Sequence, residues 1–341
     1  MSEKKIRLSD IANELGVTAS TVSRALQDHP RISDSTKEAV VKKAEELNYQ
    51  YNNIAAALRK GTSNLLGILV PTADRNFFSS IIRGVEELAN DTGYNVVICQ
   101  SYDSFEKEKK NINALLEAQV DGILASIAME TADYAHYQKV LDSNIPLIFY
   151  DRVNPSLHTS SVVVDDYRGA YQVVEHLVDQ GCSRIAHFAG EQHINIYQER
   201  LRGYKDALKA HDLPVDEQLI IKNKLKLDSG SEAMKQLLSL SNPPDAIFSA
   251  SDYAAIGAIQ VLKEKNIDVP GQIAVAGFSN EQFTSLVDPP LTTIDQQTNK
   301  MGKMAAELFF QQMKSKEQEF EPQQKVLEPK LITRASTLKK R

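Results

Sequence analysis

Apolar runs and amphipathic stretches alternate along the chain from Leu65 onward. Eight apolar runs are rich in β-branched residues and mostly lack polar alternation: LLGILV, NVVICQ, DGILAS, IPLIFYD, SVVVD, RIAHFAG, DAIFSA and IAVAGF. Such runs are typical of strands that are covered on both faces, so the sheets are predicted to be largely parallel. The stretches between them, among them 77–93, 171–181 and 254–266, predict helices. Repeated strand and helix units indicate doubly wound α/β layers, and their number predicts two lobes.

The first fifty residues show a different pattern, in which three short amphipathic segments each follow a residue that can cap a helix. The three expected caps are Ser9, Thr18 and Ser33. Gly16 tolerates the left-handed turn that would end the first helix. The expected inward stripes of the three helices are Ile11, Ala12 and Leu15; Val22, Ala25 and Leu26; and Val40, Val41, Ala44 and Leu47. Three short helices with a glycine-containing turn between the first two predict a helix-turn-helix unit.

Charge is divided unevenly between this head and the rest of the chain. The net charge is −6, but residues 1–60 hold ten Lys and Arg against eight Asp and Glu, which leaves 29 against 37 for the remainder. The sign of this asymmetry indicates that the head is the part that meets a polyanion. With 341 residues, of which 42 % are apolar and 25 % charged, the sequence predicts a globular protein of two or three domains.

The sequence lacks the signatures of a membrane protein, a secreted protein or an enzyme. No run reaches the ~18 apolar residues of a membrane span, and no apolar region follows the lysines of MSEKKIRLSD, so a cytoplasmic protein is expected. Cys99 and Cys182 lie in or beside apolar runs and are interpreted as core residues. Nucleophile-elbow, phosphate-loop and zinc-protease motifs are absent from the sequence. We therefore expect no catalytic centre, no metal and no cofactor.

The segment VTASTVSRAL, residues 17–26, concentrates hydroxyl groups and one arginine on the face expected to point outward. That face comprises Thr18, Ala19, Ser20, Thr21, Ser23 and Arg24. Short polar side chains let a helix enter a major groove about 12 Å wide, where Arg24 can reach the O6 and N7 atoms of guanine. Taken alone, the segment is also compatible with an ordinary capped surface helix.

The stretch LSDIANELGVTASTVSRALQDHPRISDSTKEAVVKKAEELNYQYN resembles the DNA-binding head of the lactose/galactose repressor (LacI/GalR) family. NNIAAALRKGTS is similar to the hinge helix of that family. VDGILAS, IPLIFYDR, VVVDDYRGA, RLRGYKDAL, FSASDYAAIGA, VAGFSNEQF and PPLTTIDQ follow in the expected order, so the likeness covers nearly all of residues 6–335. The resemblance implies an all-α helix-turn-helix head joined to a two-lobed α/β core like a type I periplasmic binding protein.

The resemblance also implies domain boundaries. It places the head at 1–50, the hinge helix and linker at 51–63, and an effector-binding and dimerisation core at 64–341. Lobe 1 is expected at about 64–161 and 291–325, and lobe 2 at about 162–290 and 326–341.

Roles for single residues follow from the same resemblance. The residues expected at base edges are Ala19, Ser20 and Arg24. Those expected near phosphates are Ser9, Thr18, Thr21, Ser23, Asn48 and Tyr49. Those expected in the minor groove at the hinge are Asn52, Ala55 and Leu58, with Leu58 as the wedge between base pairs. Tyr51 and Ala56 depart from the family pattern, in which proline and arginine are usual.

The residues that the resemblance places at the effector site are Phe77, Phe78, Ser79, Asp151, Arg200, Ser251, Asp252 and Ser279. Phe77, Phe78 and Asp151 also follow predicted strands, where open α/β sheets bind ligands. Aromatic faces with Asp and Arg suit a sugar or a related polar ring. Two alternatives stay open here, since Asp252 can cap the next helix and Arg200 can form a surface ion pair. Ser279 departs from the aspartate usual in sugar-responsive relatives.

The expected function is that of a homodimeric repressor that binds double-stranded, pseudopalindromic operator DNA and is not an enzyme. A small effector, a carbohydrate, is expected to switch DNA binding by closing the two lobes. The alternative is a soluble sugar-binding or sugar-processing protein in which the head is an interaction module. Within the regulator class, a phosphoprotein co-regulator and a tetramer formed through the lobes stay open.

Overall fold

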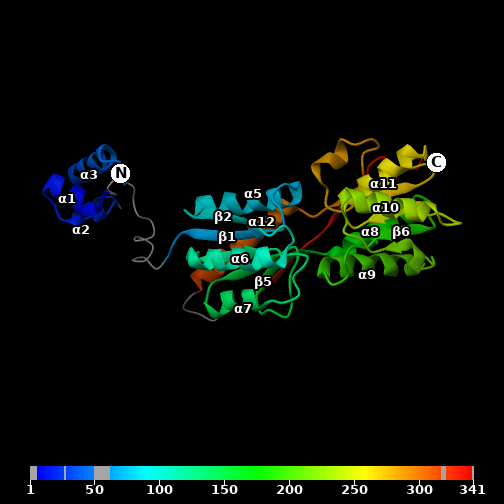
Figure 1. Cartoon of the computed structure of the whole chain (residues 1–341), viewed down its shortest axis with the longest axis horizontal. Helices are drawn as coiled ribbons and strands as arrows, with labels where there is room; N and C mark the ends of the chain where they lie inside the picture. Colours follow the sequence, from blue (N-terminus) through cyan, green and yellow to red (C-terminus); the bar gives the residue numbers. More distant parts are fainter. Residues whose placement is uncertain (1–5, 27, 50–61, 316–319, 340–341) are drawn as a thin grey trace. The chain divides into compact units, whose positions relative to one another are not determined.

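The computed structural model describes residues 6–26, 28–49, 62–315 and 320–339. The chain divides into two compact units, Met1–Ser63 and Asn64–Arg341. The first is a small helical head and the second an α/β core (Figure 1). Among the described residues, no helix has both the length and the apolar character needed to cross a membrane.

Within residues 6–26 and 28–49 the head forms the three short helices that the sequence predicts. They are α1 (Leu8–Leu15), α2 (Ala19–Ala25) and α3 (Asp34–Glu46). The Thr18 hydroxyl accepts a hydrogen bond from the Thr21 backbone N at 3.2 Å, and Ser33 caps α3 in the same way. Gly16 ends α1 with φ 64°. The buried centre contains Ile11, Ala12, Val22, Ala25, Val40 and Ala44.

Two details of the head differ from the expectation. The helix α1 begins before Ser9, and the Asp10 carboxylate closes its start by accepting a hydrogen bond from the Arg7 backbone N at 2.7 Å. An acidic side chain at the third helical position can satisfy this amide, so a hydroxyl cap at Ser9 is not needed. Val41 is 44 % exposed, because the inward stripe of α3 passes through Val40 and Ala44.

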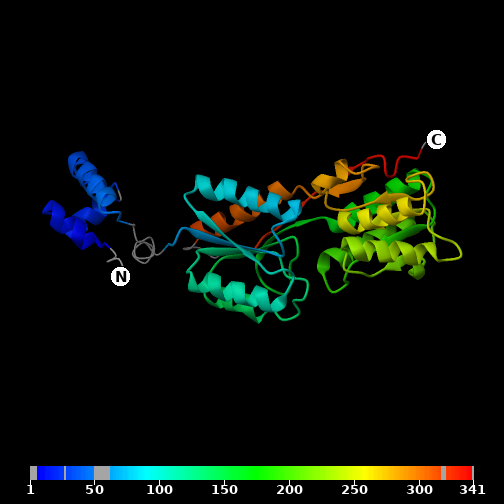
Figure 2. The ribbon, with the colours of Figure 1, turned by 45° about the horizontal axis from the view of Figure 1, so that its top comes forward.

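Lobe 1 of the core is a six-stranded parallel sheet in the order β11-β5-β4-β3-β1-β2. Its strands are β1 (Leu65–Val70), β2 (Asn95–Gln100), β3 (Gly122–Ala125), β4 (Leu147–Tyr150), β5 (Ser160–Val164) and β11 (Gln324–Leu327). One face packs on α5 (Asn76–Asp91) and α12 (Thr298–Lys314), which lie side by side (Figure 2). The other face packs on α6 (Phe105–Glu117) and α7 (Ala135–Asp142).

Lobe 2 contains a four-stranded parallel sheet in the order β7-β6-β8-β9. Its strands are β6 (Ile185–Phe188), β7 (Ile220–Ile221), β8 (Ala246–Ser249) and β9 (Ala274–Ala276). Helices α8 (Asp166–Asp179) and α9 (Asn195–Ala210) cover one face, and α10 (Leu227–Leu238) and α11 (Asp252–Glu264) cover the other. An antiparallel pair, β10 (Thr293–Asp295) and β12 (Lys330–Ile332), lies beside β9 through a bridge between Ala276 and Thr292. Two short 3-10 turns, Glu217–Leu219 and Gln282–Ser285, complete the lobe.

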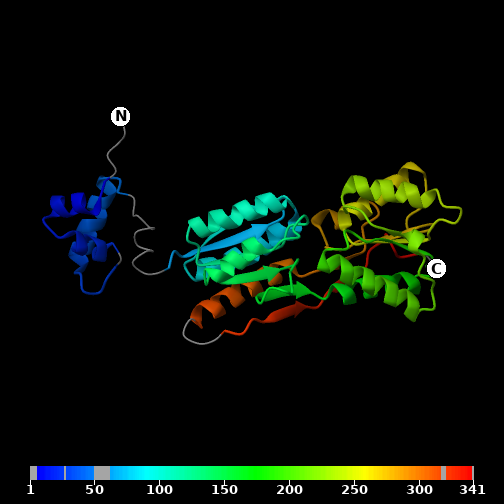
Figure 3. The same cartoon turned by 60° about the horizontal axis from the view of Figure 1, so that its bottom comes forward.

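The chain crosses between the lobes three times. It leaves lobe 1 after β5, returns after β10, and leaves again between β11 and β12, so β11 lies beside β5 although the two are far apart in sequence (Figure 3). Each crossing falls a few residues later than the boundaries expected from the sequence. The reason is that β5 and β11 continue to Val164 and Leu327, while residues 292–295 still pair within lobe 2. The chain therefore passes to the other lobe only after the preceding strand has finished pairing with its neighbour.

Candidate functional site

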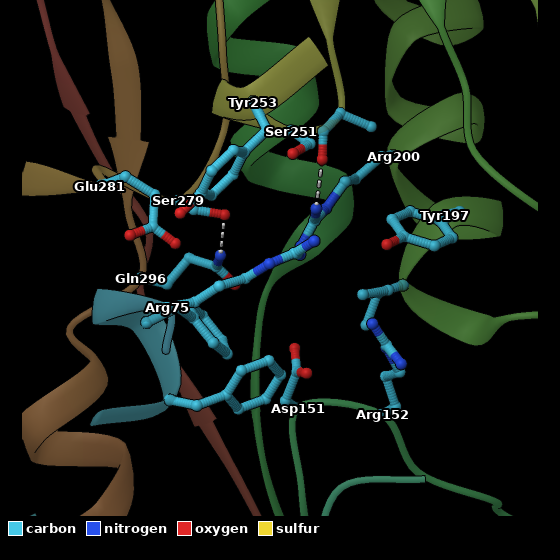
Figure 4. Close-up of a pocket in the computed structure, with 14 residues that line it drawn as sticks. Arg75, Asp151, Arg152, Tyr197, Arg200, Ser251, Tyr253, Ser279, Glu281 and Gln296 are labelled. Atoms are coloured by element: carbon cyan, nitrogen blue, oxygen red, sulfur yellow. Dashed lines mark hydrogen bonds between the residues drawn. The ribbon is translucent and has the colours of Figure 1, made fainter. Parts of the chain in front are cut away.

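The carboxyl ends of β1, β4, β8 and β9 lie at a cleft between the two lobes, as expected for ligand sites of open α/β sheets. The space free of protein atoms at this cleft is about 430 Å³, open solvent at its mouth included (Figure 4). Its lining consists of Arg75, Phe77, Phe78, Asp151, Arg152, Ile196, Tyr197, Arg200, Ala250, Ser251, Tyr253, Ser279, Glu281 and Gln296.

Asp151 directs a buried carboxylate into this cavity from the end of β4 (Figure 4). The residue has a φ of 60° and is 5 % exposed. Its Oδ2 atom accepts a hydrogen bond from the Ser126 hydroxyl at 3.1 Å. Burial raises the pKa of Asp151, while the nearby guanidinium groups of Arg152 and Arg200 act in the opposite direction. An ionised carboxylate accepts about four hydrogen bonds, so acceptor positions remain for hydroxyl donors in the cleft.

Arg200 is an internal support of the site. It is 2 % exposed, and its Nε atom donates to the Asp166 carboxylate at 2.7 Å while Nη1 donates to the Ala250 carbonyl at 2.8 Å. Its guanidinium lies 3.8 Å from the centre of the Phe278 ring. The alternative of a surface ion pair is therefore wrong. Arg200 holds α8, α9 and the loop after β8 in fixed positions around the cavity.

The cavity wall contains six of the eight residues expected at the effector site: Phe77, Phe78, Asp151, Arg200, Ser251 and Ser279. Ser79 is exposed on α5, outside the wall. Asp252 is fully buried behind the wall, where its carboxylate accepts hydrogen bonds from the Thr293 hydroxyl at 2.7 Å and the Glu281 backbone N at 2.9 Å. Burial raises the pKa of Asp252 to about 6. It therefore joins α11 to β10 and to the loop after β9, and the N-cap of α11 is Ser251.

Several residues that were not predicted from the sequence also line the cavity: Arg75, Arg152, Ile196, Tyr197, Tyr253, Glu281 and Gln296. Arg152 follows Asp151 directly, and Glu281 lies two positions after Ser279. Their position shortly after a strand could therefore have identified them as site residues. Arg152 is buried and pairs with the Asp103 carboxylate, but its Nε atom has no hydrogen-bond partner among the described residues. Gln296 donates to the Ser279 hydroxyl at 3.1 Å.

The lobes contact each other on both sides of the cavity. On one side the His193 Nε2 atom lies 2.7 Å from the Met129 carbonyl oxygen, and the Asn195 side chain accepts a hydrogen bond from the Val153 backbone N at 3.3 Å. On the other side the Arg75 guanidinium lies 4.9 Å from the centre of the Tyr253 ring. These contacts join the two lobes next to the cavity.

In the head, most residues expected at DNA are accessible. The exposed members are Ser9, Thr18, Ala19, Ser20, Arg24 and Asn48, and the half-buried members are Thr21 and Tyr49. The outward placement of Ser23 is wrong, because Ser23 is 6 % exposed and faces the helical core beside Val22. The middle helix packs on two neighbours, which widens its buried face. Asn52, Ala55 and Leu58 lie outside the described residues.

Comparison with known protein families gives two matches along the chain. Residues 7–52 match the lacI family of bacterial regulatory proteins. Residues 174–337 match a periplasmic binding protein-like domain. The two matches fall on the helical head and on the α/β core.

Full-length relatives and solved structures agree with these matches. The HTH-type transcriptional regulator DegA of Bacillus subtilis strain 168 is 32 % identical over 335 residues, which cover 98 % of each chain. The structure of the Lac repressor dimer bound to operator and the anti-inducer ONPF superposes with a TM-score of 0.86 at 27 % identity, over 98 % of this chain and 100 % of the other. A complex of the transcriptional regulator CelR with cellobiose gives a TM-score of 0.74 at 29 % identity, over 97 % and 99 %. The chain therefore belongs to the LacI family of bacterial transcriptional regulators.

Proposed function

We propose that this protein is a homodimeric repressor whose operator binding is switched by a small, hydroxyl-rich effector, a carbohydrate, in the cleft between its lobes. The observation that carries the effector class is Asp151. Its buried carboxylate faces the cavity with one hydrogen bond, from Ser126, and no cation lies within ion-pair distance among the described residues. A ligand with several hydroxyl donors satisfies such a carboxylate, and leaving it without donors is costly.

The apolar part of the wall fits the same ligand class. Phe77 and Phe78 pack edge to face with ring centres 4.9 Å apart, and Tyr197 and Tyr253 lie on the lobe 2 side. Aromatic rings accept the C–H faces of a sugar ring, while the polar groups around them fix its orientation. The CelR complex with cellobiose supports this assignment.

DNA binding is proposed for the exposed face of α2. Ala19, Ser20 and Arg24 are exposed, and Arg24 is the long donor among them. The proposed role of Arg24 is a bidentate contact to guanine in the major groove, while the hydroxyl groups of Thr18 and Thr21 contact phosphates. One short helix contacts few bases, so two copies of the head on a symmetric site are needed for specificity. The Lac repressor dimer bound to operator supports this arrangement.

The two sites are proposed to communicate through lobe closure. An effector that touches Asp151 in lobe 1 and Tyr197 in lobe 2 binds the closed lobes more tightly than open ones. It can shift the conformational equilibrium only by that difference in affinity. A coupling of about 1–3 kcal/mol changes operator affinity 5- to 150-fold.

The test uses the full chain and a library of random DNA duplexes, so that the protein itself selects the operator sequence. The selected duplexes should contain two symmetric half-sites, and one mono- or disaccharide of a panel should change their affinity. Equal, salt-sensitive binding to every duplex would contradict the repressor assignment. Chemical turnover of a sugar would instead support the sugar-processing alternative.

A further inference from the structure

A short segment after β9, residues 279–284, brings two side chains to the cleft wall, Ser279 and Glu281 (Figure 4). Asn280 lies between them, and Ser279 and Asn280 have φ values of 133° and 51°. Such backbone angles are uncommon for residues other than glycine, and they persist where the surrounding structure holds them. The position of both wall residues therefore depends on the contacts that fix this segment.

Arg334, from the part of the chain after β12, contacts the 279–284 segment through its guanidinium group. Its Nη2 atom donates a hydrogen bond to the Asn280 side-chain oxygen at 2.9 Å, and Nη1 donates to the Thr284 hydroxyl at 3.0 Å. Nη1 also donates to the Leu291 carbonyl at 2.7 Å. One planar group with several N–H donors thus joins two points of the segment to the chain that follows it.

The main chain of Arg334 is itself held in place by Thr292, which is fully buried. The Arg334 backbone N donates to the Thr292 hydroxyl at 2.8 Å, and this hydroxyl lies 3.0 Å from the Arg334 carbonyl oxygen. Two positions later, the Ser336 hydroxyl accepts a hydrogen bond from the Thr292 backbone N at 2.8 Å. The guanidinium group therefore extends from a fixed point of lobe 2 to the 279–284 segment.

We propose that Arg334 is a positioning residue of the effector site, which fixes the 279–284 segment so that Ser279 and Glu281 keep their places in the cleft wall. Within the described part of the chain, the acceptors of its guanidinium group are all neutral. The role thus depends on the planar arrangement of the N–H donors, which a lysine does not reproduce although it keeps the charge. The inference rests on the proposed function in one respect, namely that the cleft is the effector site.

The first experiment measures how often the 279–284 segment opens, without any ligand. The backbone amides of Asn280 and Glu281 donate to the Thr293 hydroxyl at 3.1 Å and to the Asp252 carboxylate at 2.9 Å. Because these hydrogen bonds protect the amides, their hydrogen exchange in the full chain measures local opening. Mass spectrometry at pH 7 follows the peptide of residues 277–287 and, as a reference in the same lobe, a peptide that covers α10.

Arg334→Ala should accelerate exchange in the 277–287 peptide roughly 10- to 100-fold, because hydrogen bonds from a charged donor are lost, and should leave α10 unchanged. Arg334→Lys should show most of this acceleration. Lys330→Ala is the matched control, because Lys330 is exposed in the neighbouring strand β12. If Arg334→Ala does not fold, Arg334→Gln replaces it. Wild-type exchange of the 277–287 peptide in the alanine or glutamine variant, equal acceleration in α10, or full protection in Arg334→Lys overturns the proposal.

The second experiment connects the segment with the ligand. Neutral mono- and disaccharides, cellobiose among them, are compared by thermal midpoint shift, and the sugar with the largest wild-type shift is then titrated calorimetrically. Arg334→Ala should bind this sugar roughly tenfold more weakly, and it should bind the selected operator duplex without sugar as the wild type does. Equal sugar affinity of the two proteins overturns the role in ligand binding. If no sugar shifts the wild type, the effector assignment fails, while the exchange experiment still decides whether Arg334 fixes the segment.

Discussion

Single residues in the cleft divide into those that face the cavity and those that hold the wall in place. Asp151 and Glu281 face it, whereas Arg200, Asp166 and Asp252 are bound to other parts of the protein. The distinction matters for mutagenesis, since loss of a supporting residue leaves a buried partner unsatisfied and destabilises the fold. Substitutions of the residues that face the cavity are therefore the ones that test ligand binding.

Asp151→Ala is expected to weaken effector binding without loss of the folded core. Hydrogen bonds to a charged group contribute about 1.5–3 kcal/mol, so affinity should fall roughly 10- to 100-fold. Calorimetric titration with the sugar that shifts the wild-type midpoint measures this. Ser79→Ala is the control, because Ser79 is exposed and lies outside the cavity wall. Equal affinity of Asp151→Ala and the control would contradict the assigned role.

Arg24→Ala is expected to relax base preference at one position of each half-site. The loss of a bidentate guanine contact should cost about 1–3 kcal/mol on the preferred duplex and much less on a duplex changed at that base pair. Fluorescence anisotropy on both duplexes measures the difference. Arg31→Ala supplies a control from the same head, since Arg31 is also exposed. A uniform loss on both duplexes would make Arg24 a phosphate contact.

The raised pKa of Glu281 is expected to make the stability of the fold depend on pH. Burial raises the pKa of Glu281 to about 7, the nearby Asp252 carboxylate acts in the same direction, and Arg75 and the amides of α5 oppose the shift. In the folded chain Glu281 thus keeps a proton at pH values where the unfolded chain has lost it. The free energy of unfolding should therefore fall as pH rises from about 5 to about 7. Denaturant unfolding across this pH range should show a smaller fall in the free energy of unfolding for Glu281→Gln than for the wild type. The same dependence on pH in both proteins would show that Glu281 is not the group responsible.

At the scale of elements, the sequence was informative where a segment was long and uniformly apolar. All eight apolar runs are strands, and wherever two of them are neighbours in a sheet they pair in parallel. NVVICQ has the composition of a central strand but forms the edge strand β2, where Ile98 is 44 % exposed. The composition of a strand indicates whether its faces are buried, but it does not indicate which strands are its neighbours in the sheet.

The segments that were missed are short or polar. β7, β10, β11 and β12 have two to four residues, and QKVL in β11 carries two long polar side chains. Such strands form because an existing sheet has an edge with which they can pair. The local sequence of the segment does not show that this edge is nearby. The same limit applies to the cleft. Six expected residues line it, but Arg75 and Tyr253 come together through tertiary structure alone.

The packing of α5 on α12 gives a prediction at this scale. A Cβ atom on Gly84 would lie 2.1 Å from the Asn299 carbonyl oxygen, so the two backbones approach too closely for a side chain. Gly84→Ala should lower the free energy of unfolding by about 1–3 kcal/mol or more. Gly67→Ala is the control, because there the nearest atom, at 2.9 Å, belongs to the flexible Leu115 side chain. Chemical denaturation of both variants checks the order, and an equal or smaller loss in Gly84→Ala would contradict it.

For the whole molecule, the decisive feature is that neither lobe is continuous in sequence. The segment after α12 supplies β11 to the sheet of lobe 1 and β12 to lobe 2. Further along, the Ser336 hydroxyl donates to the Val275 carbonyl at 2.6 Å and accepts from the Thr292 backbone N at 2.8 Å. The last part of the described chain therefore completes both lobes.

A chain that stops after residue 320 is expected to lose cooperative unfolding in both lobes, because each sheet system then lacks a strand. Thermal unfolding followed by circular dichroism measures this. Addition of a peptide of residues 320–341 should restore part of the transition by mass action. A truncated chain that unfolds cooperatively near the full-length midpoint would show that β11 and β12 are dispensable.

The late position of β11 has a consequence for synthesis of the protein. Gln323, next to β11, bonds to Ser160 at the start of β5, 163 positions earlier. At about 5–20 residues per second, the ribosome needs on the order of ten seconds to deliver the partner of β5. During that time β5 has an unpaired edge, which is the kind of surface that other chains join. The nascent protein thus passes through an interval in which chaperone protection matters most, and that interval ends only when the ribosome has synthesised β11.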